Sequence, residues 1–169
     1  MTDAVLADAF AHHVWANLRV LDACRALNPE QLATFVPGTY GSILDTIRHV
    51  VGGDASYLNV LTGGRVASID DENMNLEQLR AAADGHRADW AALVGGDFDP
   101  AADVVRHRDD GSASHAPMGI RLAQALHHGT DHRSQICTAL TTLGVEPPEI
   151  DVWAFAQQDG RISVVPAPA

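Results

Sequence analysis

The chain has 169 residues and a formal net charge of −11, with 22 acidic residues against 11 basic ones, all of them arginine. This length suits one domain with a sizeable core. The lack of a basic cluster argues against nucleic-acid binding, and the lack of lysine excludes catalysis through a lysine Schiff base.

The amino-terminal sequence, the lack of a long apolar segment and the two cysteines predict a cytoplasmic protein. The amino terminus shows neither the basic start nor the unbroken apolar run of a signal peptide, and no segment is apolar over the length of a membrane span. Cys24 and Cys137 lie inside predicted helices and do not resemble a disulfide framework. We therefore expect neither a membrane nor a nucleic acid among its partners.

Four stretches have the three-and-four spacing of apolar residues that is typical of long amphipathic helices. The first ends at Asn28-Pro29, Ser42 caps the second, and Gly144 follows the last. They cover residues of about 3–27, 43–62, 76–94 and 119–143. Four such helices predict an all-α protein with the architecture of a four-helix bundle.

Two further segments lie outside these helices. Between the third and the fourth, VVRHR and SASHAPM flank Asp109-Asp110-Gly111, which predicts a short hairpin or an ordered loop. The stretch EPPEIDVWAFAQQDG has room for one short helix. We expect a single domain over residues 1–160 and a flexible tail over residues 161–169.

The fourth helix contains LHHGTDHRSQI, residues 126–136. His128 and His132 are four apart and so lie one turn apart on the flank of the apolar face, whereas His127 points away from the core. His49 lies at the margin of the apolar stripe on the second helix. Together His49, His128 and His132 would supply three neutral nitrogen ligands and leave a position for water or substrate, as in catalytic zinc sites.

An interpretation without metal stays open from these residues alone. A histidine pair four apart on a helix is usually a solvated or capped pair, and nothing in the spacing shows that the second and fourth helices are neighbours. Carboxylate-bridged di-iron bundles need Glu-x-x-His pairs, which this chain lacks. Zincin proteases need glutamate after the first histidine of the pair, where this chain has Gly129.

Other polar and aromatic residues lie on or opposite the apolar stripes. His13 and His86 are in mid-stripe, which predicts core or pocket-lining side chains. Trp15 points away from the first helix's stripe, so it packs under the carboxy-terminal segment or lies in a subunit interface; we expect the interface. Cys24 lies on the apolar stripe of the first helix, and Cys137 is out of phase with the histidines of the fourth. We therefore expect neither cysteine to be a metal ligand or an exposed nucleophile.

Three separated segments resemble one known group. WANLRVL (residues 15–21), GSILDTIRHVVGGDASYL (residues 41–58) and LHHGTDHRSQI appear in the order typical of the DinB-like (DinB/YfiT-like) superfamily. His49, His128 and His132 match the three metal-ligand positions of that superfamily. HRSQ matches its usual HRGQ with Ser134 in place of glycine, and PPEIDVWAF resembles its closing stretch.

The resemblance implies a DinB/YfiT-like four-helix bundle that holds a divalent metal ion through three histidines and forms a homodimer. Characterised relatives include S-transferases and a maleylpyruvate isomerase that use mycothiol, bacillithiol or similar small thiols. The implied cofactor is Zn²⁺, with Ni²⁺ as the alternative, and the implied partners are a small thiol such as mycothiol and a small-molecule substrate. The name of the superfamily does not imply DNA binding.

The mechanism expected from this resemblance uses a metal-bound thiol, since metals lower the pKa of coordinating thiols. The thiolate would attack an electrophilic carbon, so the catalytic group is metal-bound thiol or water. Arg133 either contacts an anionic substrate or helix ends, or forms a structural salt bridge, and Asp54 either orients a ligand histidine or lies on the helix surface. The residues expected to line the pocket or support the ligands are His13, Asn17, Asp54, His86 and Arg133.

Two other functions stay open. The same three histidines could activate water for hydrolysis, which ranks lower because no residue stands out as a general base. The protein could also bind metal in a stress-response or sensing role without catalysis.

Overall fold

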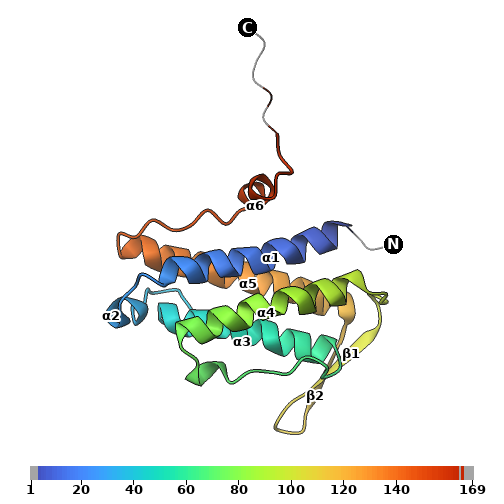
Figure 1. The fold of residues 1–169 in the computed structure, drawn as a ribbon. Helices are drawn as coiled ribbons and strands as arrows, with labels where there is room; N and C mark the ends of the chain where they lie inside the picture. Colours follow the sequence, from blue (N-terminus) through green and yellow to red (C-terminus); the bar gives the residue numbers. More distant parts are fainter. Residues whose placement is uncertain (1–3, 164, 166–169) are drawn as a thin grey trace.

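The computed structural model describes residues 4–163 and 165, and it is mostly helical with a small two-stranded sheet (Figure 1). Its long helices are α1 (Ala4–Cys24), α3 (Ile43–Leu61), α4 (Leu76–Gly95) and α5 (Met118–Thr142). The shorter elements are α2 (Pro29–Leu32), the 3₁₀ helix η1 (Asp71–Asn73), β1 (Asp103–His107), β2 (Ala113–Pro117) and α6 (Val152–Gln158).

The four long helices lie side by side, and α1 and α3 each pack against both α4 and α5 (Figure 1). Local signals place the start of two of them. Ser42 and Asn75 are in extended backbone, and their side chains accept hydrogen bonds from the amides of Asp45 and Gln78, so α3 and α4 each begin with a capping box. At the far end of α5, Gly144 has a φ of +72°, a conformation that suits glycine and closes the helix.

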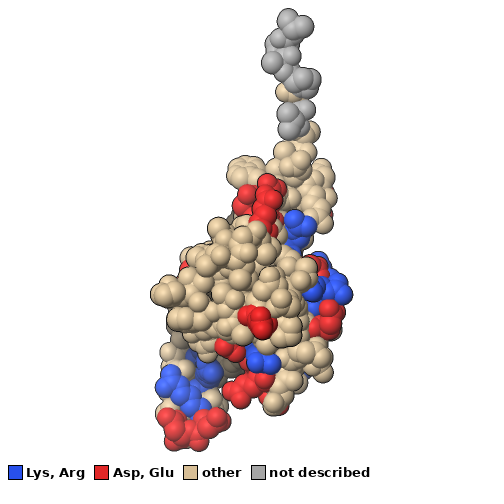
Figure 2. All heavy atoms as spheres, turned by 90° about the vertical axis from the view of Figure 1, so that its left-hand side faces the viewer, with Lys and Arg blue, Asp and Glu red and all other residues tan. Residues whose placement is uncertain are grey.

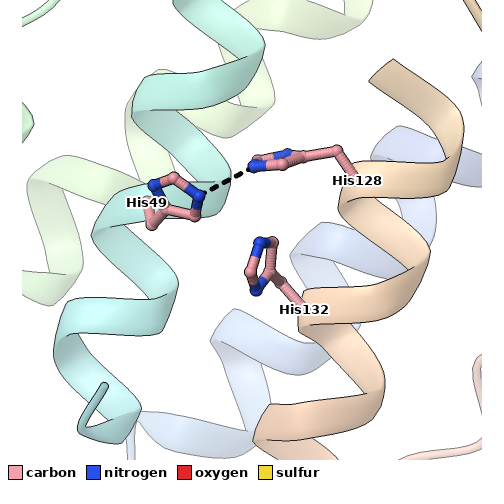
Figure 3. A group of neighbouring side chains, drawn as sticks. All are labelled: His49, His128 and His132. Atoms are coloured by element: carbon pink, nitrogen blue, oxygen red, sulfur yellow. Dashed lines mark hydrogen bonds between the residues drawn. The ribbon is translucent and has the colours of Figure 1, made fainter. Parts of the chain in front are cut away.

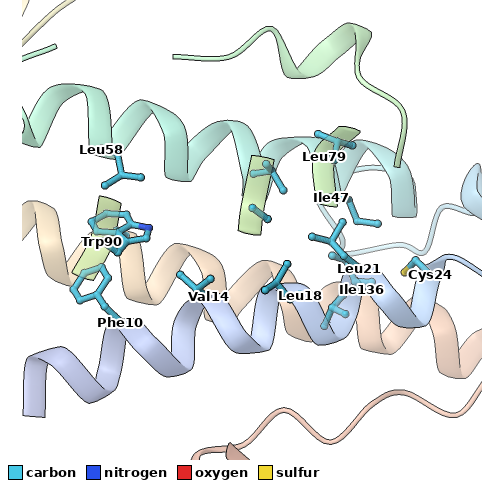
Figure 4. Close-up of a cluster of buried hydrophobic side chains, with 14 of the residues drawn as sticks. Phe10, Val14, Leu18, Leu21, Cys24, Ile47, Leu58, Leu79, Trp90 and Ile136 are labelled. Carbon is cyan, nitrogen blue, oxygen red and sulfur yellow. The ribbon is translucent and has the colours of Figure 1, made fainter. Parts of the chain in front are cut away.

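The core fills the space between the four long helices (Figure 4). The rings of Phe10 on α1 and Trp90 on α4 lie with centroids 4.4 Å apart. Leu58 of α3 and Leu140 of α5 are fully buried, so each long helix contributes to one continuous cluster. Burial of this apolar surface is the main force that holds α3 and α5, which carry the candidate site, in fixed positions.

The segment between α4 and α5 forms the expected hairpin. β1 pairs with β2 in antiparallel register, with Val105 opposite His115, and Gly111 in the turn has a φ of +81°. Arg121 at the start of α5 donates hydrogen bonds to the carbonyls of Val104 and Ser114. These bonds attach the hairpin to α5, and in Figure 1 its turn projects below α3, away from the four long helices.

The chain after the first helix differs from the prediction. α1 ends at Cys24, and Asn28-Pro29 begins a helix instead of only ending one. The side chain of Asn28 accepts a hydrogen bond from the amide of Gln31, and Pro29 occupies the first helical position, where its missing N–H costs nothing. The same two residues therefore act as the start signal of α2.

Trp15 corrects a second prediction. Its indole N–H donates a 3.0 Å hydrogen bond to Gln158 of α6, and its ring lies 5.5 Å from that of Phe155. His12 donates to the carbonyl of Ile150 at 2.8 Å. Trp15 is thus buried under the carboxy-terminal segment, and the expectation that it lies in a subunit interface is wrong.

The surface agrees with the charge pattern of the sequence. Within the described residues, no helix is long and apolar enough to cross a membrane. On the face drawn in Figure 2, uncharged residues predominate, and positive and negative side chains lie next to each other in the lower part. That face presents no continuous basic patch of the kind that binds a polyanion.

Part of the tail expected over residues 161–169 lies outside the described residues.

Candidate metal centre

Three histidine side chains from two helices meet at the junction of α3 and α5 (Figure 3). His49 projects from α3, and His128 and His132 project from successive turns of α5. The Nε2 atoms of His49 and His128 are 2.9 Å apart, and one nitrogen from each of the three rings lies within 4.8 Å of the others. The packing of α3 against α5 thus joins two parts of the sequence that are 79 residues apart.

The imidazoles are half-buried, and this affects their protonation. Burial, and then the proximity of His132 and His49, lowers the pKa of His128 to about 4. The pKa of His49 is lowered as well, first by burial and then by His132, against an opposing effect of Asp71. At neutral pH both rings are therefore neutral and have a nitrogen lone pair available, as a metal ligand requires.

Close contact between α3 and α5 at this point depends on Gly53. A Cβ atom placed at Gly53 would lie 2.6 Å from Cε1 of His128, closer than real Cβ atoms approach. The glycine thus leaves the space that the imidazole of His128 occupies. The Nδ1 atom of His128 is buried and has no hydrogen-bond partner among the described residues.

Tyr40 and Gln135, two residues outside the predicted set, contact the histidines. Tyr40, in the loop before α3, stacks on His49 with ring centroids 3.9 Å apart and an interplanar angle of 11°. Gln135 accepts a hydrogen bond from the Tyr40 amide at 2.8 Å, and its side-chain oxygen lies 3.1 Å from Nδ1 of His132. Gln135 is three residues after His132 on one helix, a spacing that could have indicated the contact; no local pattern indicates Tyr40.

A cavity of about 430 Å³ adjoins His49. Asp71 of η1 lies against α3 at Gly52, where an added Cβ would come within 2.4 Å of the carboxylate. Arg48, which also lines the cavity, donates to the carbonyl of Met74. The complete lining consists of Tyr40, Gly41, Asp45, Arg48, His49, Asp71 and Glu72. One member of the histidine group, His49, therefore also lines a polar cavity that carries three carboxylates.

The comparison with known protein families agrees with this geometry. The model of the DinB family matches residues 1–161, nearly the whole chain. The chain belongs to the DinB family. No curated protein matches it.

Four of the remaining predicted site residues of this DinB protein form a separate buried polar cluster. Asp54 of α3 accepts hydrogen bonds from Nε2 of His13 at 2.9 Å and from the side-chain amide of Asn17 at 2.9 Å. Arg133 of α5 donates to Asn17 at 2.7 Å and to Nδ1 of His13 at 3.2 Å. His13 and Asn17, both on α1, thus connect a carboxylate to a guanidinium.

This cluster changes the interpretation of Asp54 and Arg133. Asp54 is buried, so it does not lie on the helix surface, and its hydrogen bonds go to α1 instead of to the three site histidines. Arg133 is also buried, and burial lowers its pKa to about 10, against the opposing effect of Asp54. His86 is buried in α4 near this cluster, where Asp54 and His13 both affect its pKa, and its Nδ1 has no hydrogen-bond partner within the described part of the chain.

The two cysteines agree with the sequence-based expectation that neither serves as nucleophile or ligand. Cys24 lies in the core, where burial raises its pKa to about 12. Cys137 is half-buried, and burial raises its pKa as well. A thiol in either environment carries little thiolate at neutral pH.

The donor set at the junction of α3 and α5 fits a divalent metal ion. Three imidazoles, neutral at His49 and His128, present nitrogens at short mutual distances, and among the described residues no fourth histidine or cysteine belongs to this group. In tetrahedral zinc sites with Zn–N bonds of about 2.0–2.1 Å, ligand nitrogens lie roughly 3.3 Å apart, close to the separation of His49 and His128. Catalytic zinc sites combine three protein ligands with an open position.

Proposed function

We propose that this DinB protein is a divalent-metal-dependent enzyme that uses a small thiol, as an S-transferase or isomerase, with His49, His128 and His132 as metal ligands. The observation that carries the proposal is the position of His49, which belongs both to the three-histidine group and to the lining of the 430 Å³ cavity. A metal ion held there would face a space large enough for a small molecule. Zn²⁺ suits three imidazoles best, with Ni²⁺ as the alternative.

The residues of the chain have distinct parts in this proposal. A metal ion held by the three histidines would lower the pKa of a coordinated thiol, such as that of mycothiol. Tyr40 covers one face of His49 and forms a wall of the cavity. Asp45, Asp71 and Glu72 against Arg48 give the lining a net charge of −2 without metal, which a divalent ion on His49 would offset.

The bundle type, the domain bounds, the cellular location and the oligomeric state are also part of the proposal. We propose that α1, α3, α4 and α5 form the four-helix bundle of the DinB/YfiT-like type, within one domain over residues 1–160, in a cytoplasmic homodimer. The exposed apolar side chains of Val152 and Trp153 on α6 support a partner surface. Light scattering at micromolar concentration tests this point, and a monomeric mass would contradict it.

Metal content tests the ligand assignment. Protein purified without a histidine tag is expected to contain about one Zn²⁺ or Ni²⁺ per chain by elemental analysis. His49→Ala, His128→Ala and His132→Ala are each expected to lose it. His127→Ala is the matched control, because His127 is on the same helix but exposed to solvent. Unchanged metal content in all three variants would refute the assignment.

Catalysis is tested with the metal-loaded protein. It is incubated with mycothiol, bacillithiol or glutathione and with monochlorobimane, a neutral electrophile whose thiol adduct fluoresces. Acceleration over His128→Ala with one of these thiols is the expected result. A protein that binds metal but accelerates none of these reactions would instead be the metal-binding stress-response or sensing protein.

A metal-dependent hydrolase is the second candidate, and Asp71 is the observation that favours it. Its carboxylate lines the cavity next to His49, in a position to accept a proton during attack by water, which the sequence did not indicate. Hydrolysis of neutral ester or amide substrates that is lost in Asp71→Asn, with metal content retained, would support this function over thiol transfer.

A further inference from the structure

Gln135 connects the candidate metal centre to the loop before α3. Its side-chain oxygen lies 2.8 Å from the backbone nitrogen of Tyr40 and 3.1 Å from Nδ1 of His132. Both distances are within the range of direct hydrogen bonds. In the sequence, Gln135 is 95 positions from Tyr40 and three positions from His132.

These two contacts together determine which nitrogen of His132 carries the proton. A backbone N–H can only donate, so the amide of Tyr40 requires an acceptor, which identifies the facing atom of Gln135 as its oxygen. The same oxygen cannot donate to His132, so Nδ1 of His132 must carry the hydrogen. In the neutral ring, Nε2 then has the free lone pair.

The backbone contact is also one of the restraints on the loop that carries the Tyr40 ring. The Tyr40 side chain is 55% exposed, so little packing restrains it from outside. Its ring stacks on His49 at 3.9 Å and meets His132 edge-on, with centroids 5.5 Å apart. The hydrogen bond from its amide to Gln135 holds the loop at the distance that allows both ring contacts.

We propose that Gln135 is a positioning residue: it keeps His132 in the Nδ1–H tautomer, which presents Nε2 at the site, and it holds Tyr40 against His49 as a wall of the cavity. The part that concerns metal affinity rests on the proposed function, whereas the tautomer of His132 does not. Supporting hydrogen bonds to the second nitrogen of a ligand histidine contribute strongly to metal affinity in other proteins.

The tautomer is measured first, in metal-free protein at pH 8 with ¹⁵N-labelled histidine. Long-range ¹H–¹⁵N spectra distinguish a protonated from an unprotonated ring nitrogen. Wild type is expected to show His132 as the Nδ1–H form, and Gln135→Leu, which has no acceptor, is expected to shift it toward Nε2–H. Gln135→Glu keeps an acceptor oxygen and is expected to retain the wild-type form. An Nε2–H ring in the wild type would overturn the proposal without any variant.

Zn²⁺ affinity is measured next, by competition with a chromophoric chelator. Gln135→Leu is expected to bind roughly 10- to 100-fold more weakly than wild type, and Gln135→Glu is expected to recover most of that loss. Thr138→Ala is the matched control, since Thr138 is an exposed residue of α5 whose hydroxyl bonds only to the carbonyl of Ser134.

The two measurements separate the two proposals. Failure of the wild type to bind Zn²⁺ would refute the metal centre, while the spectra would still decide the role of Gln135. Tight binding by wild type and Gln135→Leu alike, with the same His132 tautomer in both, would refute the role of Gln135 and leave the metal centre standing.

Discussion

Single residues determine whether the three imidazoles can meet. Gly53 lies in the interior of α3, where glycine lowers helix stability relative to alanine. Its benefit is spatial, because the missing side chain leaves room for the ring of His128. The loss of helix stability is thus offset by the space that Gly53 leaves for His128 of α5. Such a conflict between local helix preference and packing is typical of functional positions.

Gly53→Ala is expected to weaken Zn²⁺ binding by roughly tenfold or more, because the new methyl group displaces His128 from its place beside His49. Gly85→Ala is the matched control: Gly85 is in the interior of α4, and a Cβ there meets no atom within 4 Å. The control is expected to leave Zn²⁺ affinity unchanged and to stabilise the protein by about 0.5–1 kcal/mol. Equal Zn²⁺ affinity in both variants would show that Gly53 does not limit the site.

At the scale of elements, the buried polar cluster joins three of the long helices. Asp54 of α3 and Arg133 of α5 both bond to His13 and Asn17 of α1, away from solvent. A buried charge is tolerated when its hydrogen bonds are satisfied and an opposite charge is near. The residues lie next in sequence to the site, since Asp54 follows Gly53 and Arg133 follows His132, so the cluster also holds α3 and α5 in register behind the histidines.

Asp54→Ala is expected to lower the free energy of unfolding by roughly 3–5 kcal/mol, because it leaves the buried guanidinium of Arg133 without its counter-charge. Asp22→Ala removes an exposed carboxylate that pairs with Arg80 of α4, and it is expected to cost less than about 1 kcal/mol. Urea denaturation followed by circular dichroism measures both. Similar losses in the two variants would show that the buried cluster contributes no more than a surface ion pair.

Across the whole molecule, burial makes the histidines sensitive to pH. The pKa values of His12, His49, His86 and His128 are all lowered, in each case chiefly by burial. In the unfolded chain these groups return to a pKa of about 6.5. Below that pH the unfolded chain binds more protons than the folded one, so falling pH favours unfolding.

The free energy of unfolding of the metal-free protein is therefore expected to be highest above about pH 6.5 and to fall as the pH is lowered toward the folded-state values. Urea denaturation at a series of pH values from about 7.5 to about 5 tests this. His86→Gln removes one of these groups from α4, away from the three site histidines, and is expected to give a shallower dependence. Stability that is constant or rises over this range would contradict the expectation.

Much of the helical framework was predictable because its signals are local. Apolar spacing, the cap at Ser42, and Gly144 each act within one or two turns, and they place α3, α4 and α5 within a few residues of where they occur. The turn signal at Gly111 is local too, and of the two predicted alternatives, a short hairpin or an ordered loop, the structure has the hairpin. Helical spacing also put His128 and His132 on one side of α5 and His49 at the margin of the apolar stripe of α3, and the family resemblance supported these three residues as one ligand set.

Other features depend on contacts between distant parts of the chain. Trp15 faces away from the core of its own helix, and only the return of α6 decides that it is covered within the chain. Tyr40 comes from the loop before α3 and Asp71 from the short helix η1; no periodic pattern predicts the position of either, yet both line the cavity.

The sequence by itself determined the helices, the histidine pair and the family resemblance, because periodicity, caps and motifs are properties of short segments. Only the tertiary structure decided that His49 meets that pair, that Asp54 is buried against α1, and that Gln135 connects His132 to Tyr40. The physical reason is that side-chain packing between helices selects these contacts, and packing depends on the shape of the whole core.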